Sequence, residues 1–77
     1  LSLNLRGMRY DEARDTLIKY LDKVVMSGLQ EVEIVHGKGE GVLRKMTHEV
    51  LSNNPHVSEY FHKRPESGGT GVTVVRF

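Results

Sequence analysis

Apolar and polar positions alternate in two short stretches of the chain, residues 1–5 and residues 31–36. A period of two is typical of strands that bury one face, so each stretch predicts a half-buried β-strand. Residues 57–62 and the β-branched run at residues 71–77 predict two further strands. Between these, residues 63–70 are rich in Pro, Gly and Ser and predict a loop.

Two longer stretches carry apolar residues at spacings of three and four, which predicts amphipathic helices. The first covers residues 10–27 and ends at Gly28, because glycine tolerates the positive φ of a helix C-terminus. The second follows Gly41 and ends at residues 53–55, where the sequence is Asn-Asn-Pro. The apolar positions are Ala13, Leu17, Leu21, Val24 and Val25 in the first helix and Val42, Leu43, Met46, Val50 and Leu51 in the second.

The predicted element order is βαβαββ. Strand–helix–strand units favour parallel pairing, whereas the third and fourth strands can pair antiparallel or be separated in the sheet. Alternation in the first two strands indicates that helices cover one face only, because a sheet buried on both faces reads as continuous apolar runs. We therefore predict an α/β (α+β) two-layer sandwich with a four-stranded mixed sheet and helices on one face. The residues predicted on the open face are Ser2, Asn4, Glu31, Glu33 and Thr73.

The composition fits one small folded domain, residues 1–77. Apolar residues make up 38% and charged residues 27%, which is ordinary for a globular chain and speaks against disorder. The lack of cysteine excludes disulfides and thiolate metal sites, and no apolar run approaches the roughly 18 residues of a membrane span. The chain shows neither a signal peptide nor a starting Met, so we expect a domain excised from a larger protein.

Charge is informative through its distribution, because the formal net charge is only +1. Basic residues gather at the two predicted strand-to-helix junctions, whereas acids concentrate in the first helix and the second strand. Ligands gather at the carboxyl ends of parallel strands, so the junctions form one basic end if they lie side by side. The basic residues are Arg6, Arg9, Lys38, Arg44 and Lys45.

The second junction is a loop with glycine at every second position, Gly37, Gly39 and Gly41. Glycine admits positive φ and a close approach of other groups, and the unpaired N–H groups at the start of the next helix attract anions. The pattern predicts a phosphate cradle, with a tight turn that binds nothing as the alternative. The loop lacks the Gly-Lys-Ser/Thr ending of nucleoside-triphosphate loops, so ATP is not an expected ligand.

Cleavage of a phosphodiester needs a group that activates the nucleophile and groups that stabilise charge on the phosphorane. Arg6 and Lys38 are candidates for stabilisation, and His36 is a candidate base or acid. His36 is equally compatible with a strand-end histidine that bonds a loop carbonyl. Glu40 is a candidate base or metal ligand, or a residue in the first helical turn that complements the dipole. Asp11, in the first helix, is a weaker candidate with the same structural alternative.

No metal site and no cofactor bound by the domain itself are predicted. The histidines show no paired spacing such as His-x-x-x-His, and His48 and His56 are predicted at the surface. Any Mg²⁺ or Mn²⁺ would be held by substrate phosphate. Aromatic stacking on nucleic-acid bases is a further option for Tyr60, Phe61 and Phe77, with core packing as the alternative.

Three segments resemble the small MutS-related (Smr) domain, and the match covers nearly the whole chain. They are residues 3–8 (Leu-Asn-Leu-Arg-Gly-Met), residues 36–41 (His-Gly-Lys-Gly-Glu-Gly) and residues 68–75 (Gly-Gly-Thr-Gly-Val-Thr-Val-Val). Arg6 resembles the branch of the family that forms the C-terminus of the second bacterial MutS paralogue. Many other Smr domains carry histidine at this place.

The resemblance implies a two-layer α/β fold similar to the C-terminal domain of bacterial translation initiation factor three. It also implies binding of DNA or RNA, with DNA-nicking or RNA-cleaving endonuclease activity in the family. The parent is then a MutS-like protein of the bacterial cytoplasm, acting in suppression of recombination, DNA repair or rescue of stalled ribosomes. No membrane partner is expected.

One position departs from the family pattern. Where the family has Leu-Asp-Leu, this chain has Asn4. An amide is neither an anion nor a base at neutral pH, so Asn4 cannot replace a carboxylate that ligates a metal or activates water. The departure weakens the resemblance to a nuclease and leaves the resemblance to a binding domain intact.

The hypothesis from the sequence is a nucleic-acid-binding domain with DNA-nicking endonuclease activity. The alternatives are a non-catalytic domain that docks on branched DNA or ribosomal RNA, and a purely protein-binding module. Met8 is either exposed for contact with nucleic acid or packed in the fold. The predicted catalytic residues are His36, Glu40, Arg6 and Asp11, and the predicted nucleic-acid contacts are Arg6, Gly7, Met8, Arg9, His36, Gly37, Lys38, Gly39, Gly41, Arg44 and Lys45.

Overall fold

The computed structural model describes residues 1–77 and confirms the predicted βαβαββ order. Its elements are β1 (Ser2–Asn4), α1 (Tyr10–Ser27), β2 (Glu31–Val35), α2 (Val42–Ser52), β3 (Glu59–His62), two short 3-10 turns η1 (Pro65–Ser67) and η2 (Gly69–Gly71), and β4 (Val72–Arg76). η1 lies within the predicted loop at residues 63–70, where Pro65 at its first position fixes φ for a turn. η2 reaches one residue further, so that Gly71, predicted as the start of the last strand, belongs to this turn.

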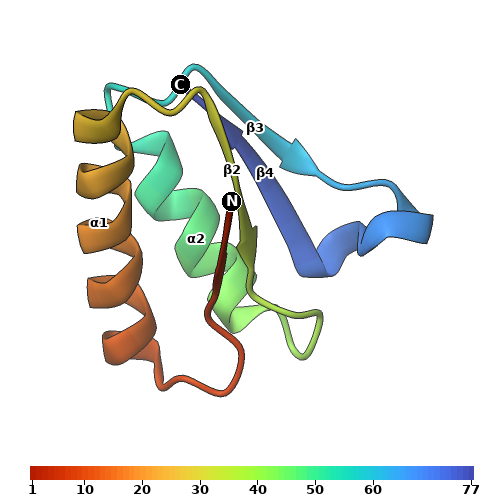
Figure 1. Ribbon diagram of the computed structural model, residues 1–77. Helices are drawn as coiled ribbons and strands as arrows, with labels where there is room; N and C mark the ends of the chain where they lie inside the picture. Colours follow the sequence, from red (N-terminus) through yellow and green to blue (C-terminus); the bar gives the residue numbers. More distant parts are fainter.

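The sheet is mixed, with strand order β1-β2-β4-β3. β1 and β2 pair in parallel, as expected for a strand–helix–strand unit. β4 pairs antiparallel with both β2 and β3, so β3 runs in the direction of β2 but is separated from it by the last strand. Both helices cover the same face of this sheet, which gives the predicted two layers (Figure 1).

The core lies between the helices and the sheet. It contains Leu5, Ala13, Leu17, Leu21, Val24, Val32, Ile34, Met46, Leu51 and Val75. Most predicted apolar positions of the helices face this layer, but Val42 does not and is 52% exposed. Val42, which the sequence groups with the apolar positions of this helix, is the first residue of α2 and lies outside its buried face, because the helix has just left the loop.

The ends of α1 follow from the local sequence. Gly28 adopts a left-handed φ of 71°, and its N–H bonds the carbonyls of Val24 and Val25. At the other end Arg9 occupies the N-cap position without a side-chain hydrogen bond, while Asp11 lies in the first turn and complements the helix dipole. The prediction of residues 10–27 is therefore confirmed.

One residue predicted on the open face lies on the other side of the sheet. Ser2, Asn4 and Glu31 are exposed as expected, but Thr73 is fully buried. Thr73 pairs with the core residue Ile34, and directly opposed residues of antiparallel strands share a face. Thr73 therefore faces the helices.

The open face is lined by long polar side chains joined across the strands. Lys63 Nζ lies 2.7 Å from Glu33 Oε2, and Arg76 donates to Glu31 at 2.8 Å and to Glu59 at 2.9 Å. The carboxylates of this face are thus paired. No helix has the length and apolarity required to cross a bilayer.

Candidate functional site

The two basic strand-to-helix junctions meet at one end of the molecule. Leu5 continues the parallel pairing beyond β1, because its N–H bonds the Val35 carbonyl at 2.7 Å. Immediately after it, the Arg6 side chain crosses Gly37, so that a Cβ on Gly37 would lie 3.2 Å from Arg6 Cγ. Figure 1 shows both loops at the end where the two helices begin. The expectation that the junctions form one basic end is confirmed for Arg6 and the glycine loop.

Asn4 holds Arg6 in place. Its Oδ1 accepts hydrogen bonds from the Arg6 backbone N–H at 3.0 Å and from Arg6 Nε at 3.3 Å. The first bond is an Asx turn, which an aspartate can form equally well. Asn4 therefore supplies the hydrogen-bond geometry that an aspartate would supply, without the negative charge.

The glycine loop needs its glycines. The φ values are 78° at Gly37, 36° at Gly39 and 84° at Gly41, and residues with a Cβ rarely adopt such positive values. The loop closes on itself through the Gly41 N–H, which bonds the Lys38 carbonyl at 3.1 Å. Residues 36–44 line a hollow of about 260 Å³.

A second glycine segment, residues 68–71, packs against the first. The Gly71 carbonyl accepts the N–H groups of His36 at 3.1 Å and Gly37 at 3.0 Å. Lys38 runs along this segment, since Cβ atoms on Gly69 and Gly71 would lie 3.9 Å and 3.4 Å from its side-chain carbons. Sequence reasoning missed this contact, although the run Gly-Gly-Thr-Gly is a signal for close backbone approach.

The start of α2 offers free donors to the hollow. The N–H groups of Val42, Leu43 and Arg44 have no hydrogen-bond partner, and the first turn holds no acid. Arg44 folds back so that its Nη2 lies 3.0 Å from the Cβ position of Gly41. Glu40 is exposed and precedes the N-cap, so its predicted place in the first helical turn is wrong.

His36 lies beneath the loop and is only 4% exposed. Its Nδ1 lies 2.9 Å from the Gly37 carbonyl, and its Nε2 lies 2.7 Å from Thr73 Oγ1. Both ring nitrogens are therefore engaged. Of the two interpretations left open by the sequence, this geometry matches the histidine that bonds a loop carbonyl. Burial lowers the pKa of His36, the bond to the Gly37 carbonyl acts against this shift, and interactions with His62 and Arg44 add to it.

His48 is not a plain surface residue, contrary to the prediction. Its Nε2 lies 3.0 Å from Thr73 Oγ1, and its ring lies 5.1 Å from that of His62 and 5.2 Å from that of Tyr60. The helix face and the register of β4 create this cluster, and no spacing in the sequence shows it. His56 is exposed as predicted.

The other predicted residues differ in their surroundings. Gly7 is exposed with a φ of 82°, whereas Met8 is half-buried and packs on the core, which matches its structural alternative. Arg9, Asp11 and Lys45 are exposed near the starts of the helices. The His, Asp and Glu side chains form no group of three that could hold a metal ion.

The cations of the loop have no carboxylate partners. The ion pairs of the structure join Lys19 to Asp15 on α1, and Lys63 and Arg76 to the glutamates of the open face. Arg6, Lys38 and Arg44 are absent from them. Their positive charge is therefore available to an anion.

The aromatic side chains divide between the two faces. Tyr60 and Phe77 are half-buried and pack on the core, which matches the alternative to base stacking that the sequence left open. Phe61 is 40% exposed on the open face, where the Arg76 guanidinium lies 5.0 Å from its ring centroid. Phe61 is therefore the one aromatic residue of the three with a substantial exposed surface.

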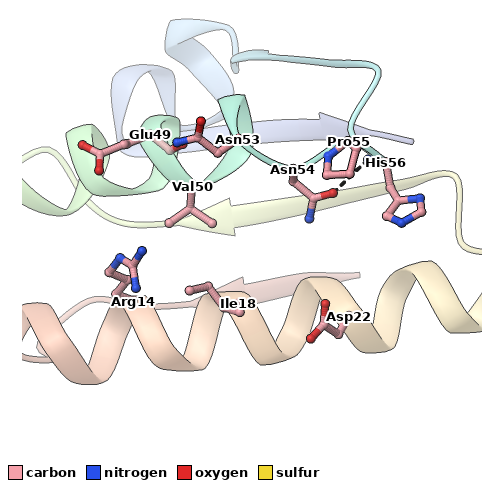
Figure 2. Close-up of a pocket in the computed structure, with 9 residues that line it drawn as sticks. All are labelled: Arg14, Ile18, Asp22, Glu49, Val50, Asn53, Asn54, Pro55 and His56. Atoms are coloured by element: carbon pink, nitrogen blue, oxygen red, sulfur yellow. Dashed lines mark hydrogen bonds between the residues drawn. The ribbon is translucent and has the colours of Figure 1, made fainter.

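A larger hollow of about 360 Å³ lies between the helices. Figure 2 shows Arg14, Ile18 and Asp22 of α1 along one side of it, with Glu49 of α2 on the opposite side near Arg14 and Asn54 on the opposite side near Asp22. Two acids against one arginine give this surface no attraction for phosphate. The anion-binding features thus belong to the glycine loops and not to the larger cavity.

Fold and site together define a class: a two-layer α/β domain with a basic glycine loop at the carboxyl ends of its parallel strands. The family model for the Smr domain matches residues 3–77, and the chain belongs to that family. The crystal structure of the Smr domain of Thermus thermophilus MutS2 superposes with a TM-score of 0.93 at 35% identity, covering 97% of this chain and 94% of that one. YdaL, a stand-alone small MutS-related protein from Escherichia coli, gives 0.92 at 28% identity, covering 99% and 63% of the respective chains.

Two relatives identify larger proteins that contain such a domain. The chain is 55% identical over 73 residues to the endonuclease MutS2 of Halothermothrix orenii and 54% identical over 74 residues to that of Clostridium botulinum. These matches cover 95% and 96% of this chain but only 9% of each relative's length.

Proposed function

We propose that this domain binds the phosphate backbone of nucleic acid at the glycine loops and serves there as a nicking endonuclease domain of a MutS2-like parent protein. The observation that carries the binding proposal is the meeting of three cations without carboxylate partners around one glycine loop. Arg6 comes from the end of β1, Lys38 from the loop after β2, and Arg44 from the first turn of α2. Backbone contacts of this kind carry no sequence preference.

The surroundings of these cations suit a phosphate. Free N–H groups at the start of α2 add donors directed at the same hollow, and the positive end of the helix dipole lies behind them. Arg6 is held by Asn4, so little of its conformational freedom is left to lose on binding. A planar guanidinium matches two phosphate oxygens at once.

Nicking would use the same groups at the scissile phosphate. Water attacks phosphorus, the bond to the leaving oxygen breaks, and the leaving oxygen takes up a proton. Arg6 and Lys38 would neutralise the charge on the phosphorane oxygens. Glu40 is the exposed carboxylate of the loop and the available acceptor for the water proton. The enclosed position of His36 favours a positioning role, and any Mg²⁺ or Mn²⁺ would enter with the substrate.

A second candidate is a non-catalytic domain that docks on branched DNA or ribosomal RNA. Two features favour it: Asn4 stands where the resemblance to the family implies a carboxylate, and no group of side chains is arranged to hold a metal. Both candidate functions require the same phosphate contacts, so only a measurement of cleavage distinguishes them.

The binding test compares two double variants with equal loss of charge. Arg6→Ala/Lys38→Ala is expected to weaken binding of labelled duplex DNA about tenfold or more, because a hydrogen bond to a charged group contributes about 1.5–3 kcal/mol. Lys19→Ala/Lys23→Ala on α1 is the matched control and should bind like the unmodified chain. The slope of log K against log salt should become about 0.9 less negative for each phosphate that the variant no longer neutralises. Equal effects of both double variants would contradict the assigned surface and favour a protein-binding module.

The cleavage test follows nicking of supercoiled plasmid with Mg²⁺, with Mn²⁺ and with EDTA. Nicking by the unmodified chain that disappears in Glu40→Gln supports catalysis at the loop. Binding with no nicking under any condition supports the docking domain.

A further inference from the structure

Three polar side chains form a continuous chain of hydrogen bonds beneath the first glycine loop. His36 follows β2, Thr73 lies on β4 and His48 lies on α2. Thr73 Oγ1 stands between the rings, 2.7 Å from His36 Nε2 and 3.0 Å from His48 Nε2. His36 and Thr73 are 4% and 0% exposed, so the bond between them is shielded from water, whereas the bond from His48 to Thr73 is only partly buried.

The Gly37 carbonyl fixes the direction of the whole chain. A carbonyl can only accept, so His36 Nδ1, at 2.9 Å, must donate to it. In the neutral ring Nε2 is then an acceptor, and Thr73 must donate its single hydroxyl proton to it. The Thr73 oxygen in turn accepts from His48 Nε2. Only one tautomer of each ring satisfies every bond.

Burial favours the neutral form of both rings. It lowers the pKa of His36 and of His48, and the positive charge of Arg44 on α2 acts in the same direction, whereas the bond to the Gly37 carbonyl raises the pKa of His36. The ring of His48 also packs against that of Tyr60, with 5.2 Å between the ring centroids. No carboxylate pairs with either ring. The neutral tautomers that the bonds require are thus the favoured forms.

The bond from His36 sets the orientation of one peptide group in the loop. In a trans peptide the C=O and the following N–H point in opposite directions. Because the Gly37 carbonyl points to the His36 ring, the Lys38 N–H points away from it, and it has no hydrogen-bond partner. A flip of this peptide would rotate ψ of Gly37, and glycine has no Cβ to oppose that rotation. A flip would replace the free N–H by a carbonyl oxygen, which repels phosphate.

We propose that Thr73 and His48 are positioning residues that hold His36 in its Nδ1–H tautomer and thereby present the Lys38 N–H to the bound phosphate. The role in presenting the Lys38 N–H to phosphate rests on the proposed binding function. The tautomer of His36 is a property of the free domain and is measured separately.

The first measurement is made without nucleic acid. In ¹⁵N and ¹³C spectra of the unmodified chain, His36 should be the Nδ1–H tautomer and His48 the Nε2–H tautomer. Thr73→Val removes the hydroxyl at nearly constant shape, and it should populate the other tautomer of His36 and shift the Lys38 amide resonance. Thr73→Ser, which keeps the hydroxyl, should restore both signals. An Nε2–H tautomer of His36 in the unmodified chain, or an unchanged His36 in Thr73→Val, would overturn the proposal.

The second measurement is the affinity for labelled duplex DNA. Thr73→Val is expected to weaken binding severalfold with an unchanged salt slope, because no cation is removed. A matched pair at His48 gives an independent check: His48→Gln retains a donor and should bind tightly, whereas His48→Leu should resemble Thr73→Val. A tautomer change without any change in affinity would overturn the role in presenting the Lys38 N–H. If the unmodified chain itself fails to bind DNA, the proposed function is wrong. The tautomer measurement then still shows whether Thr73 and His48 hold His36 in the Nδ1–H form.

Discussion

The side-chain oxygen of Asn4 accepts both the backbone N–H and the Nε of Arg6, at 3.0 Å and 3.3 Å. This pair links the end of β1 to the first glycine loop, because the same arginine crosses Gly37. A short amide thus determines where a long cation lies. The arrangement allows the geometric and chemical roles of this position to be tested apart.

Asn4→Ala should weaken nucleic-acid binding without loss of fold. Asn4 is exposed, and its removal frees the Arg6 side chain, which costs the net value of about one hydrogen bond, 0.5–1.5 kcal/mol. The corresponding loss in affinity is a few-fold and is measured by fluorescence anisotropy. An Arg6→Ala background should abolish the effect, since the two residues act together.

Asn4→Asp should keep the Asx turn and restore a carboxylate beside the loop. We expect weaker binding, because the new charge partly neutralises Arg6, together with increased plasmid nicking. Faster nicking would show that the chain lacks only this group for efficient cleavage. Weaker binding with no gain in nicking would count against a catalytic carboxylate at this place.

Gly68→Ala should destabilise the domain more than Gly39→Ala. A Cβ on Gly68 would lie 2.6 Å from Val72 Cγ2, and its φ is 124°, whereas Gly39 faces open space with a φ of 36°. Gly39→Ala therefore carries backbone strain alone, of about 1–2 kcal/mol, and Gly68→Ala adds a steric clash. Urea unfolding of both variants gives the two losses in the free energy of unfolding. Equal losses would mean that the segment around Gly68 adjusts to the added Cβ at little cost.

Stability should fall as the solution is acidified through the histidine range. His36 and His48 have lowered pKa values in the folded state, so the unfolded chain binds protons first, beginning near its pKa of about 6.5. The stabilisation is present in full above that pH and is lost as the pH falls towards the lowered folded values. Thermal unfolding between pH 7.5 and 5 measures this, with the exposed His56→Asn as a control that should follow the same curve.

Leu17→Ala should cost about 2–5 kcal/mol, since Leu17 is fully buried between the layers and its truncation leaves a cavity. Val42→Ala, at a position 52% exposed, should stay within about 0.5 kcal/mol. Chemical denaturation compares them directly. A large effect at Val42 would contradict its exposed position at the start of α2.

Periodicity predicted the elements because each depends on local sequence. The spacing of three and four through α1 and the glycine at its end define that helix without help from the rest of the fold. Thr73 shows where this reasoning stops. In the run Val-Thr-Val-Val, neither face is marked by polarity, and the register with Ile34 decides that the threonine faces the helices.

The candidate site divides in the same way. Gly37, Gly39 and Gly41 are visible in the sequence because their positive φ is a local demand. The contact of Lys38 with the second glycine segment joins residues far apart in the chain and depends on the tertiary fold. The partnership of His48 with Thr73 likewise needs α2 to be packed on β4.

The position of the last strand has a consequence for synthesis. β4 lies in the middle of the sheet and is the only link between β3 and the strands β1 and β2. During translation the helices can form early, but β3 has no neighbour until residues 72–76 emerge from the ribosome. A nascent chain arrested before that point therefore exposes unpaired strand edges. The four-stranded sheet can form only after β4 has been synthesised and pairs with both β2 and β3.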